Sequence, residues 1–272
     1  MKYVVSQRAL ESIERECRIH PDTETGGIIV GYREENLTTI THATGPGINW
    51  ERSSHHFVKD TEYLQSVLNL LFQYFQVNYL GVWHKHPPDM PYPSSGDVAS
   101  AMAEISDSQV GLAELITPIC VVRGSKVSVI PYVIKDNAFA QVVWQPTPPN
   151  RLANVSSLDV QWYTRTVGQE RLAKELERFR EIGVEADVRK GTDGTYRFHV
   201  PVGSGSNLVM VCPHEYPVAP PEVAVYAQDS KKQDSKKYAP VTSHILDIWS
   251  IHQYLGDLVE EQRGKLAQSS VS

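Results

Sequence analysis

A proline-rich run near the middle of this 272-residue chain limits what the chain can fold into. The run is Gln145-Pro-Thr-Pro-Pro-Asn150. Proline has no backbone N–H and a fixed φ, so we expect neither a strand nor a helix to continue through the run. We therefore predict two domains, at residues 1–145 and 158–272, joined by a linker at 146–157. Both lengths are close to that of an ordinary domain.

Hydrophobic spacing before this run switches between the periods of a helix and of a strand. The helical stretches are 6–19, a run from the N-cap Asp60 to Phe75, and 95–106. Strand-like stretches occupy 26–31, 37–44, 79–84, 117–123, 126–135 and 139–144. This order predicts a mixed α/β (α+β) domain, with a mixed sheet flanked by helices.

The second part of the chain has a simpler order. Apolar residues from Val160 onward predict a long helix that ends near Gly183, and a second helix is expected at 250–267. Between them we expect strands at 185–191, 195–202 and 207–213. Thr192-Asp193-Gly194 is a favourable hairpin turn between the first two strands. This part is therefore predicted to be an α+β domain.

Composition narrows the classes of partner. Hydrophobic residues make up 41% and charged residues 21% of the chain, which is ordinary for a soluble protein. The net charge of −6 argues against a nucleic-acid surface, which needs clustered basic residues. Three cysteines far apart in sequence suggest reduced thiols, and no apolar run has the length of a membrane span. We expect a soluble, cytoplasmic protein with no nucleic-acid or membrane partner.

Two histidines two residues apart give the strongest chemical signal. His84 and His86 lie at a predicted strand, where side chains at this spacing point to the same side and can bind one cation. Asp97 begins a predicted helix, after a loop long enough to bring its carboxylate back to the same point. Two histidines and a carboxylate with an open fourth position are a common ligand set of catalytic zinc.

Hydrolysis at such a site needs two more groups. A carboxylate should accept the proton of the attacking water, and a neutral donor should stabilise the oxyanion. Glu24 is the candidate base and Ser94 the candidate donor. Plainer interpretations exist for each: Ser94-x-x-Asp97 can simply cap a helix, Glu24 can be a surface residue, and His84 can be a hydrogen-bonded core histidine.

The spacing of these residues resembles a known motif. Gly81-Val-Trp-His-Lys-His-Pro87 followed by Ser94-Ser-Gly-Asp97 is similar to the JAMM motif of the MPN (JAB) metalloproteases. Glu24-Thr-Gly-Gly-Ile28 resembles the strand entry that carries this family's glutamate. The resemblance covers about the first half of the chain and is closest to the bacterial JAB branch.

The resemblance implies a fold, a cofactor and a substrate class. The fold would be an MPN/JAB domain, which is cytidine-deaminase-like. Zinc would be held by His84, His86 and Asp97, with Glu24 as general base and Ser94 as oxyanion stabiliser. The substrate would be a peptide or isopeptide bond at the C-terminus of ubiquitin or a ubiquitin-like protein.

The second part resembles another family. A helix, three strands and then His214-Glu-Tyr-Pro-Val-Ala-Pro-Pro-Glu-Val223 are similar to the ubiquitin-conjugating-enzyme (UBC) fold and its RWD relatives. Ser243-His-Ile-Leu-Asp247 resembles the active-site strip of that fold, with Ile245 where its cysteine would stand. Isoleucine cannot form a thioester. The resemblance implies a non-catalytic module that binds a ubiquitin-like protein, a conjugating enzyme or a second copy of this chain.

Together these features predict a zinc-dependent isopeptidase that deconjugates a ubiquitin-like protein or processes its precursor. The resemblance places it in a bacterial ubiquitin-like pathway, with cognate activating and conjugating enzymes as partners and antiphage defence as an implied setting. Two alternatives stay open. One is a non-catalytic MPN scaffold, and the other is a metal hydrolase of small amides or peptides.

Overall fold

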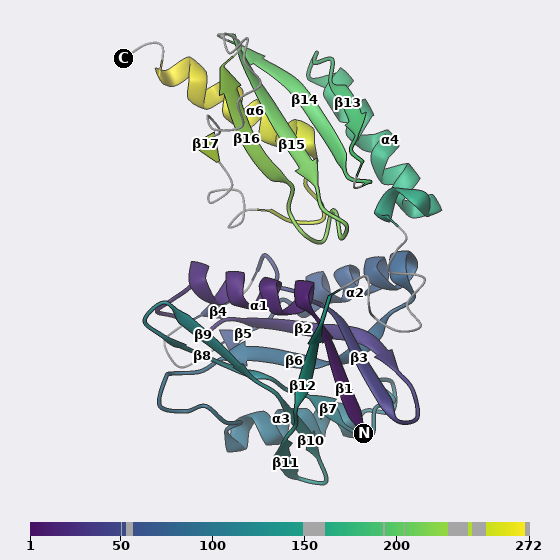
Figure 1. Cartoon of the computed structure of the whole chain (residues 1–272), viewed down its shortest axis with the longest axis vertical. Coiled ribbons are helices and arrows are strands. Elements are labelled where there is room, and N and C mark those ends of the chain that lie inside the picture. Colours follow the sequence, from purple (N-terminus) through teal and green to yellow (C-terminus); the bar gives the residue numbers. More distant parts are fainter. Residues whose placement is uncertain are drawn as a thin grey trace. The chain divides into compact units, whose positions relative to one another are not determined.

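The computed structural model describes residues 1–49, 51–52, 57–148, 161–192, 194–203, 205–227, 239–240 and 249–269. The chain divides into two compact units, Met1–Asp159 and Val160–Ser272 (Figure 1). Ile245, most of the predicted linker and the centre of the predicted turn at Asp193 lie outside the described residues. Among the described residues, no helix combines the length and apolar character that a membrane crossing requires.

The first unit is built on a ten-stranded mixed sheet. Its main path runs β11 (Ala138–Gln141), β10 (Tyr132–Lys135), β7 (Leu115–Ile116), β6 (Asn78–Lys85), β2 (Gly26–Arg33), β3 (Leu37–Ala43), β1 (Lys2–Ser6) and β12 (Trp144–Thr147). Two further strands extend from β6, namely β8 (Ile119–Arg123) and then β9 (Lys126–Ile130). A separate two-stranded pair is formed by β4 (Glu51–Arg52) and β5 (Phe57–Val58). Because β6 is antiparallel to β2 and parallel to β7 and β8, its neighbours on both sides hold it firmly.

Helices cover both faces of this sheet. Helix α1 (Gln7–Ile19) and helix α3 (Ser95–Ser106) lie on opposite faces, and α2 (Thr61–Phe75) runs from its N-cap Asp60 (Figure 1). Under α1 the core contains the fully buried Ile13, Cys17 and Trp83, and under α3 it contains Ala101 with its neighbours. Burial of such apolar side chains stabilises the layers by about 25 cal/mol per Å².

Glycines let the backbone pack tightly around β6. A Cβ at Gly27 would lie 2.0 Å from the carbonyl oxygen of Thr44, and that same oxygen accepts a hydrogen bond from Trp83 Nε1 at 2.8 Å. Gly81 has a φ of +153°, and a Cβ there would lie 2.0 Å from Ile116 O. A larger residue at Gly27 would push the segment after β3 away from β2, and one at Gly81 would push β7 away from β6. The glycines therefore fix the strand that ends at His84 and Lys85.

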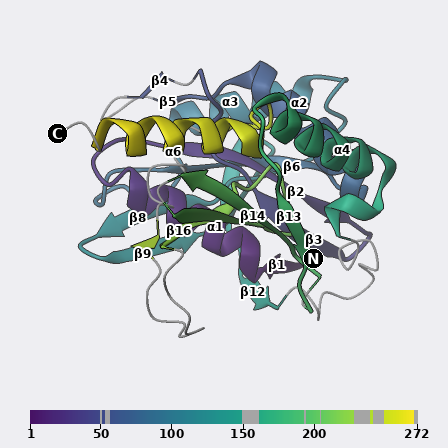
Figure 2. The ribbon, with the colours of Figure 1, turned by 90° about the horizontal axis from the view of Figure 1, so that it is seen from above.

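The second unit is an antiparallel sheet with two helices on one face (Figures 1 and 2). The strand order is β13 (Asp187–Lys190), β14 (Tyr196–Gly203), β15 (Ser206–Cys212), β16 (Glu222–Ala227) and β17 (Ala239–Pro240). The helical segments are the 3₁₀ turn η2 (Trp162–Thr164), α4 (Thr166–Glu181) and α6 (Leu255–Ser269). Phe179 of α4 packs on Phe198 of β14, with ring centroids 5.8 Å apart.

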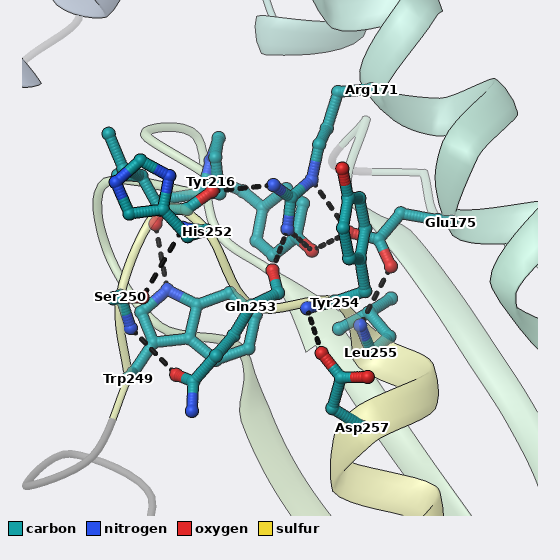
Figure 3. A network of polar contacts seen from close by, with 12 residues as sticks. Arg171, Glu175, Tyr216, Trp249, Ser250, His252, Gln253, Tyr254, Leu255 and Asp257 are labelled. Carbon is teal, nitrogen blue, oxygen red and sulfur yellow. Dashed lines mark hydrogen bonds and ion pairs between the residues drawn. The ribbon is translucent and has the colours of Figure 1, made fainter. Parts of the chain in front are cut away.

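A buried polar network joins α4 to the segment that leads into α6 (Figure 3). Arg171 Nε donates to Glu175 Oε1 at 2.7 Å, and Tyr216 donates its hydroxyl hydrogen to the same oxygen. The other oxygen, Glu175 Oε2, accepts from the backbone N–H of Leu255 at 2.7 Å. Arg171 also donates to the carbonyl oxygens of Ile251 and Gln253. These bonds satisfy the buried charges and fix the turn before α6.

The predicted mixed α/β architecture is confirmed, but several element boundaries are wrong. Residues 126–135 form two strands, β9 and β10, because Pro131, which lacks an N–H, separates them along the chain. The helix expected from Val160 begins at Thr166, and the one expected from 250 begins at Leu255. Beyond the three strands expected in the second unit, β16 and β17 extend its sheet.

The prediction that no strand continues into the proline-rich run is wrong at the start of the run. Trp144–Thr147 forms β12, which pairs in parallel with β1, so strand structure continues through Pro146. Because β12 is the last strand of the main path, the missing N–H of proline can face away from the ladder.

Candidate active site

The two histidines lie where β6 ends. His84 N donates to Pro118 O at 3.3 Å, and His86 N donates to Cys120 O at 2.8 Å, so both are held against the segment that forms β8. Their Nε2 atoms are 2.7 Å apart, and the exposed fractions of the side chains are 13% and 4%. The i, i+2 spacing therefore brings both imidazoles to one point, with their Nε2 atoms foremost.

Asp97 meets the histidines from the first turn of α3. Its Oδ1 lies 3.1 Å from His84 Nε2, and its Oδ2 lies 3.3 Å from His86 Nε2. One potential ligand atom from each of the three residues lies within 4.8 Å of the others, which is compact enough to hold a metal ion. Two imidazole nitrogens and a carboxylate are donors that zinc prefers, so the residues fit the expected metal.

Ser94 occupies the N-cap of α3, and the capping interpretation of this motif agrees with its geometry. Asp97 N donates to Ser94 Oγ at 3.2 Å, while Ser94 N donates to Asp97 Oδ2 at 2.6 Å, which completes a capping box. The Ser94 hydroxyl also donates to Asp97 Oδ2, at 2.6 Å. A hydroxyl has one hydrogen, so Ser94 must release Asp97 before it can donate to a substrate.

The loop between the motif's two halves supports His86 from behind. Two carbonyl oxygens, those of Met90 and Tyr92, each lie 3.1 Å from His86 Nδ1. Because a carbonyl can only accept, Nδ1 carries the hydrogen, and the neutral ring then presents the lone pair of Nε2 to a metal. Sequence reasoning missed these two carbonyls. The prolines between His86 and Ser94 were the available signal, since they force an ordered turn.

Charge within the cluster shifts its pKa values. Burial disfavours the ionised form of Asp97, but hydrogen bonds with His84, His86 and Ser94 outweigh it and lower the pKa of the carboxyl. Burial likewise opposes a charge on His86, yet the hydrogen bond and charge of Asp97 raise the pKa of the imidazole. The Met90 carbonyl and the charge of Glu24 add to this rise in pKa. The ionised Asp97 carboxylate therefore dominates the electrostatics of the site.

Glu24 lies two residues before the start of β2 and is half-buried. Gly26 pairs with His84 in the antiparallel ladder, and one step outward Lys85 N donates to Thr25 O at 2.7 Å. The same register continued by one more residue sets Glu24 opposite His86. The effect of Glu24 on the pKa of His86 agrees with this placement. Glu24, Ser94 and the three potential ligands thus gather at one edge of the sheet.

A match to a family of known proteins falls within this same unit. Residues 6–137 match a family model described as prokaryotic homologs of the JAB domain. A protein of Escherichia coli named CD-NTase/cGAS isopeptidase is 36% identical over 83 residues, which cover 30% of this chain and 53% of the relative. A protein of the same name from Enterobacter hormaechei is 28% identical over 123 residues, covering 44% of this chain and 66% of the relative. The chain thus spans between half and two thirds of these relatives.

A solved structure is similar to about half of the chain. The solution structure of a protein from Desulfitobacterium hafniense aligns with a TM-score of 0.44 and 17% sequence identity, over 54% of this chain and 93% of that protein.

Proposed function

We propose that the JAB domain in residues 6–137 is a zinc-dependent isopeptidase that cleaves at the C-terminus of a ubiquitin-like protein. Either a conjugate or a precursor would be its substrate. The observation that carries the proposal is the convergence of His84 Nε2, His86 Nε2 and the Asp97 carboxylate, with Glu24 beside His86 in the extended register. Such a ligand set with a carboxylate base nearby is suited to metal-assisted hydrolysis of an amide.

Each residue of the site has a separate role in the proposal. His84, His86 and Asp97 would hold zinc, which activates water and polarises a carbonyl when bound. The Glu24 carboxylate accepts a proton from the attacking water and passes it to the leaving amine. The Ser94 hydroxyl donates to the oxyanion once its hydrogen bond to the Asp97 carboxylate is broken.

The names of the relatives point to a second candidate substrate. Both are called CD-NTase/cGAS isopeptidase, so the protein freed by cleavage can be a CD-NTase in place of a ubiquitin-like protein. In either case one product bears a new C-terminal carboxylate and the other a free amine. We propose that this takes place in the bacterial cytoplasm, within a pathway that also contains activating and conjugating enzymes.

The second unit is proposed to be a non-catalytic UBC-like module that binds a protein partner. Its order of α4, consecutive antiparallel strands and a Tyr-Pro turn supports the resemblance found in the sequence. Cys212 is its only cysteine in the sequence, and this residue is 1% exposed. Burial raises the pKa of the Cys212 thiol well above its usual range, so the nucleophilic thiolate is disfavoured.

A cleavage assay tests the proposed reaction. Candidate ubiquitin-like proteins and a CD-NTase, each fused at its C-terminus to a fluorescent protein, are incubated with the zinc-loaded chain. We expect Glu24→Gln to keep zinc and lose roughly 10²–10⁴-fold in kcat, because only the proton transfer is removed. Glu11→Gln, a change of the same kind on the exposed face of α1, should cleave like the wild type.

Three outcomes of this assay argue against parts of the proposal. Full activity of Glu24→Gln would remove Glu24 from the mechanism. A zinc-loaded wild type that cleaves none of the fusions would favour the scaffold. Turnover of small amides, with none of the protein fusions, would favour the small-substrate hydrolase.

A further inference from the structure

Lys85 lies between the two histidines in the sequence, but its side chain contacts another part of the unit, the end of α1. Because successive residues of a strand point to opposite faces, Lys85 faces away from the cluster that His84 and His86 form. The residue is 4% exposed. A lysine so deeply buried needs acceptors for its amino group, because an unbonded one would cost several kcal/mol.

The acceptors of Lys85 come from the end of α1. Lys85 Nζ donates to Pro21 O at 2.7 Å and also to His20 O. His20 is the C-cap of α1, where unpaired carbonyls give the helix end a partial negative charge that favours a basic group. The backbone of Lys85 makes a further bond, from its N–H to Thr25 O. Lys85 thus bonds to both ends of the segment 20–25, through its amino group at residues 20 and 21 and through its backbone N–H at Thr25.

A second tie secures the same segment from the side of α1. Thr25 is fully buried, and its Oγ1 donates to Glu16 Oε1 at 2.6 Å. His20 Nε2 lies 3.5 Å from that same carboxylate oxygen. The segment is therefore bound near both ends, with Asp22, Thr23 and Glu24 between the ties. Glu24, the proposed base, directly precedes Thr25, which both ties hold.

We propose that Lys85 is a positioning residue that holds the segment 20–25, and with it the Glu24 carboxylate, against the strand of the metal ligands. The inference rests on the proposed function, because it assigns Glu24 the role of base. The histidines and the lysine share one strand, so any movement of His84 and His86 carries the anchor of Glu24 along. This coupling keeps the base in register with the ligands, and a misplacement of about 1 Å can cost about 10²-fold in rate.

Lys85→Met tests the tie, because methionine has a similar length and no donor. We expect zinc content and KM to stay at wild-type values while kcat falls by roughly 10–100-fold. Hydrogen exchange at residues 20–25 should accelerate by about tenfold, the factor that loss of one or two hydrogen bonds implies. The matched control is Lys59→Met, which removes a lysine bonded to Glu104 at 3.0 Å and should change neither measurement.

Combination with Glu24→Gln separates positioning from general support of the fold. If Lys85 acts through Glu24, Lys85→Met should not lower the residual rate of Glu24→Gln any further. The same fold-loss in both backgrounds would overturn the inference, as would unchanged exchange at residues 20–25. Should Lys85→Met fail to fold, Lys85→Gln replaces it, because glutamine is shorter and uncharged and should weaken the bonds to the carbonyls of His20 and Pro21. The same fall in kcat and the same faster exchange at residues 20–25 are then expected.

The two proposals fail in different ways. An inactive wild type refutes the proposed function, and the exchange measurement still reports whether Lys85 holds the segment. An active wild type whose Lys85→Met variant cleaves at the wild-type kcat refutes only the positioning role.

Discussion

Loss of Glu175 should destabilise the second unit more than any exposed glutamate on the same helix. The side chain is fully buried, and it is the shared acceptor of Arg171, Tyr216 and the backbone of Leu255 (Figure 3). Burial raises the pKa of Glu175, and the neighbouring Arg171 offsets this only in part. Glu175→Ala would leave the buried Arg171 guanidinium without its charge partner, and the Tyr216 hydroxyl and Leu255 N–H without this acceptor.

The size of the effect follows from what is left behind. Removal of one partner of a buried ion pair typically costs about 3–5 kcal/mol, because the other charge stays buried. That is a large share of the roughly 5–15 kcal/mol by which a domain is stable. A unit of this size should lose about 10–20 °C in its midpoint of thermal unfolding.

Urea unfolding followed by pulsed hydrogen exchange measures each unit separately in the full chain. Peptides of α4 should unfold at lower urea in Glu175→Ala, while peptides of β2 should not. Glu177→Ala is the matched control, because Glu177 is exposed two residues further along the helix and should change stability by less than about 0.5 kcal/mol. Equal midpoints for the two variants would refute the reasoning that loss of a buried, bonded carboxylate sets the cost.

Two further predictions concern the first unit. His42 is 6% exposed, and burial, with a smaller effect of Arg8, lowers the pKa of its imidazole to about 3 from an ordinary 6.5. Below pH 6.5 His42 is protonated in the unfolded chain but stays neutral in the folded chain. The free energy of unfolding should therefore fall as the pH drops below about 6.5, by up to about 1.4 kcal/mol per pH unit. Urea titrations between pH 4 and 7 measure this slope, which His42→Gln should reduce; an unchanged slope would assign it to other groups. Ser94→Ala should lower kcat about 10²–10³-fold and destabilise α3 by about 1 kcal/mol, and a thermal midpoint that falls while kcat stays constant would leave Ser94 as a cap alone.

Much of the first unit was predictable because local signals agree with the fold. Asp60 caps α2 as its position suggested, accepting from Tyr63 N at 3.1 Å. Strand β1 was missed because its five residues run directly into α1 and provide too short a pattern to recognise. Strand β12 was missed for a different reason: the tolerance of Pro146 depends on its place at a sheet edge, and only the three-dimensional structure shows which strand lies there.

The candidate site was likewise predictable only in part from the sequence. His84, His86 and Asp97 were candidates from their spacing alone, because a strand and a helix start impose simple geometry. The contribution of Lys85 was not foreseen, since its acceptors are backbone carbonyls that any residue could supply. The buried network of Arg171 and Glu175 depends in the same way on the turn before α6, about 80 residues later in the chain.

The central claim is that three side chains hold one zinc ion, and metal content tests it most directly. Elemental mass spectrometry of the purified chain should find about one zinc per molecule, lost in His86→Ala and retained in the exposed control His252→Ala. A folded wild type that binds no zinc when zinc is supplied, or an His86→Ala variant that keeps it, would contradict the account.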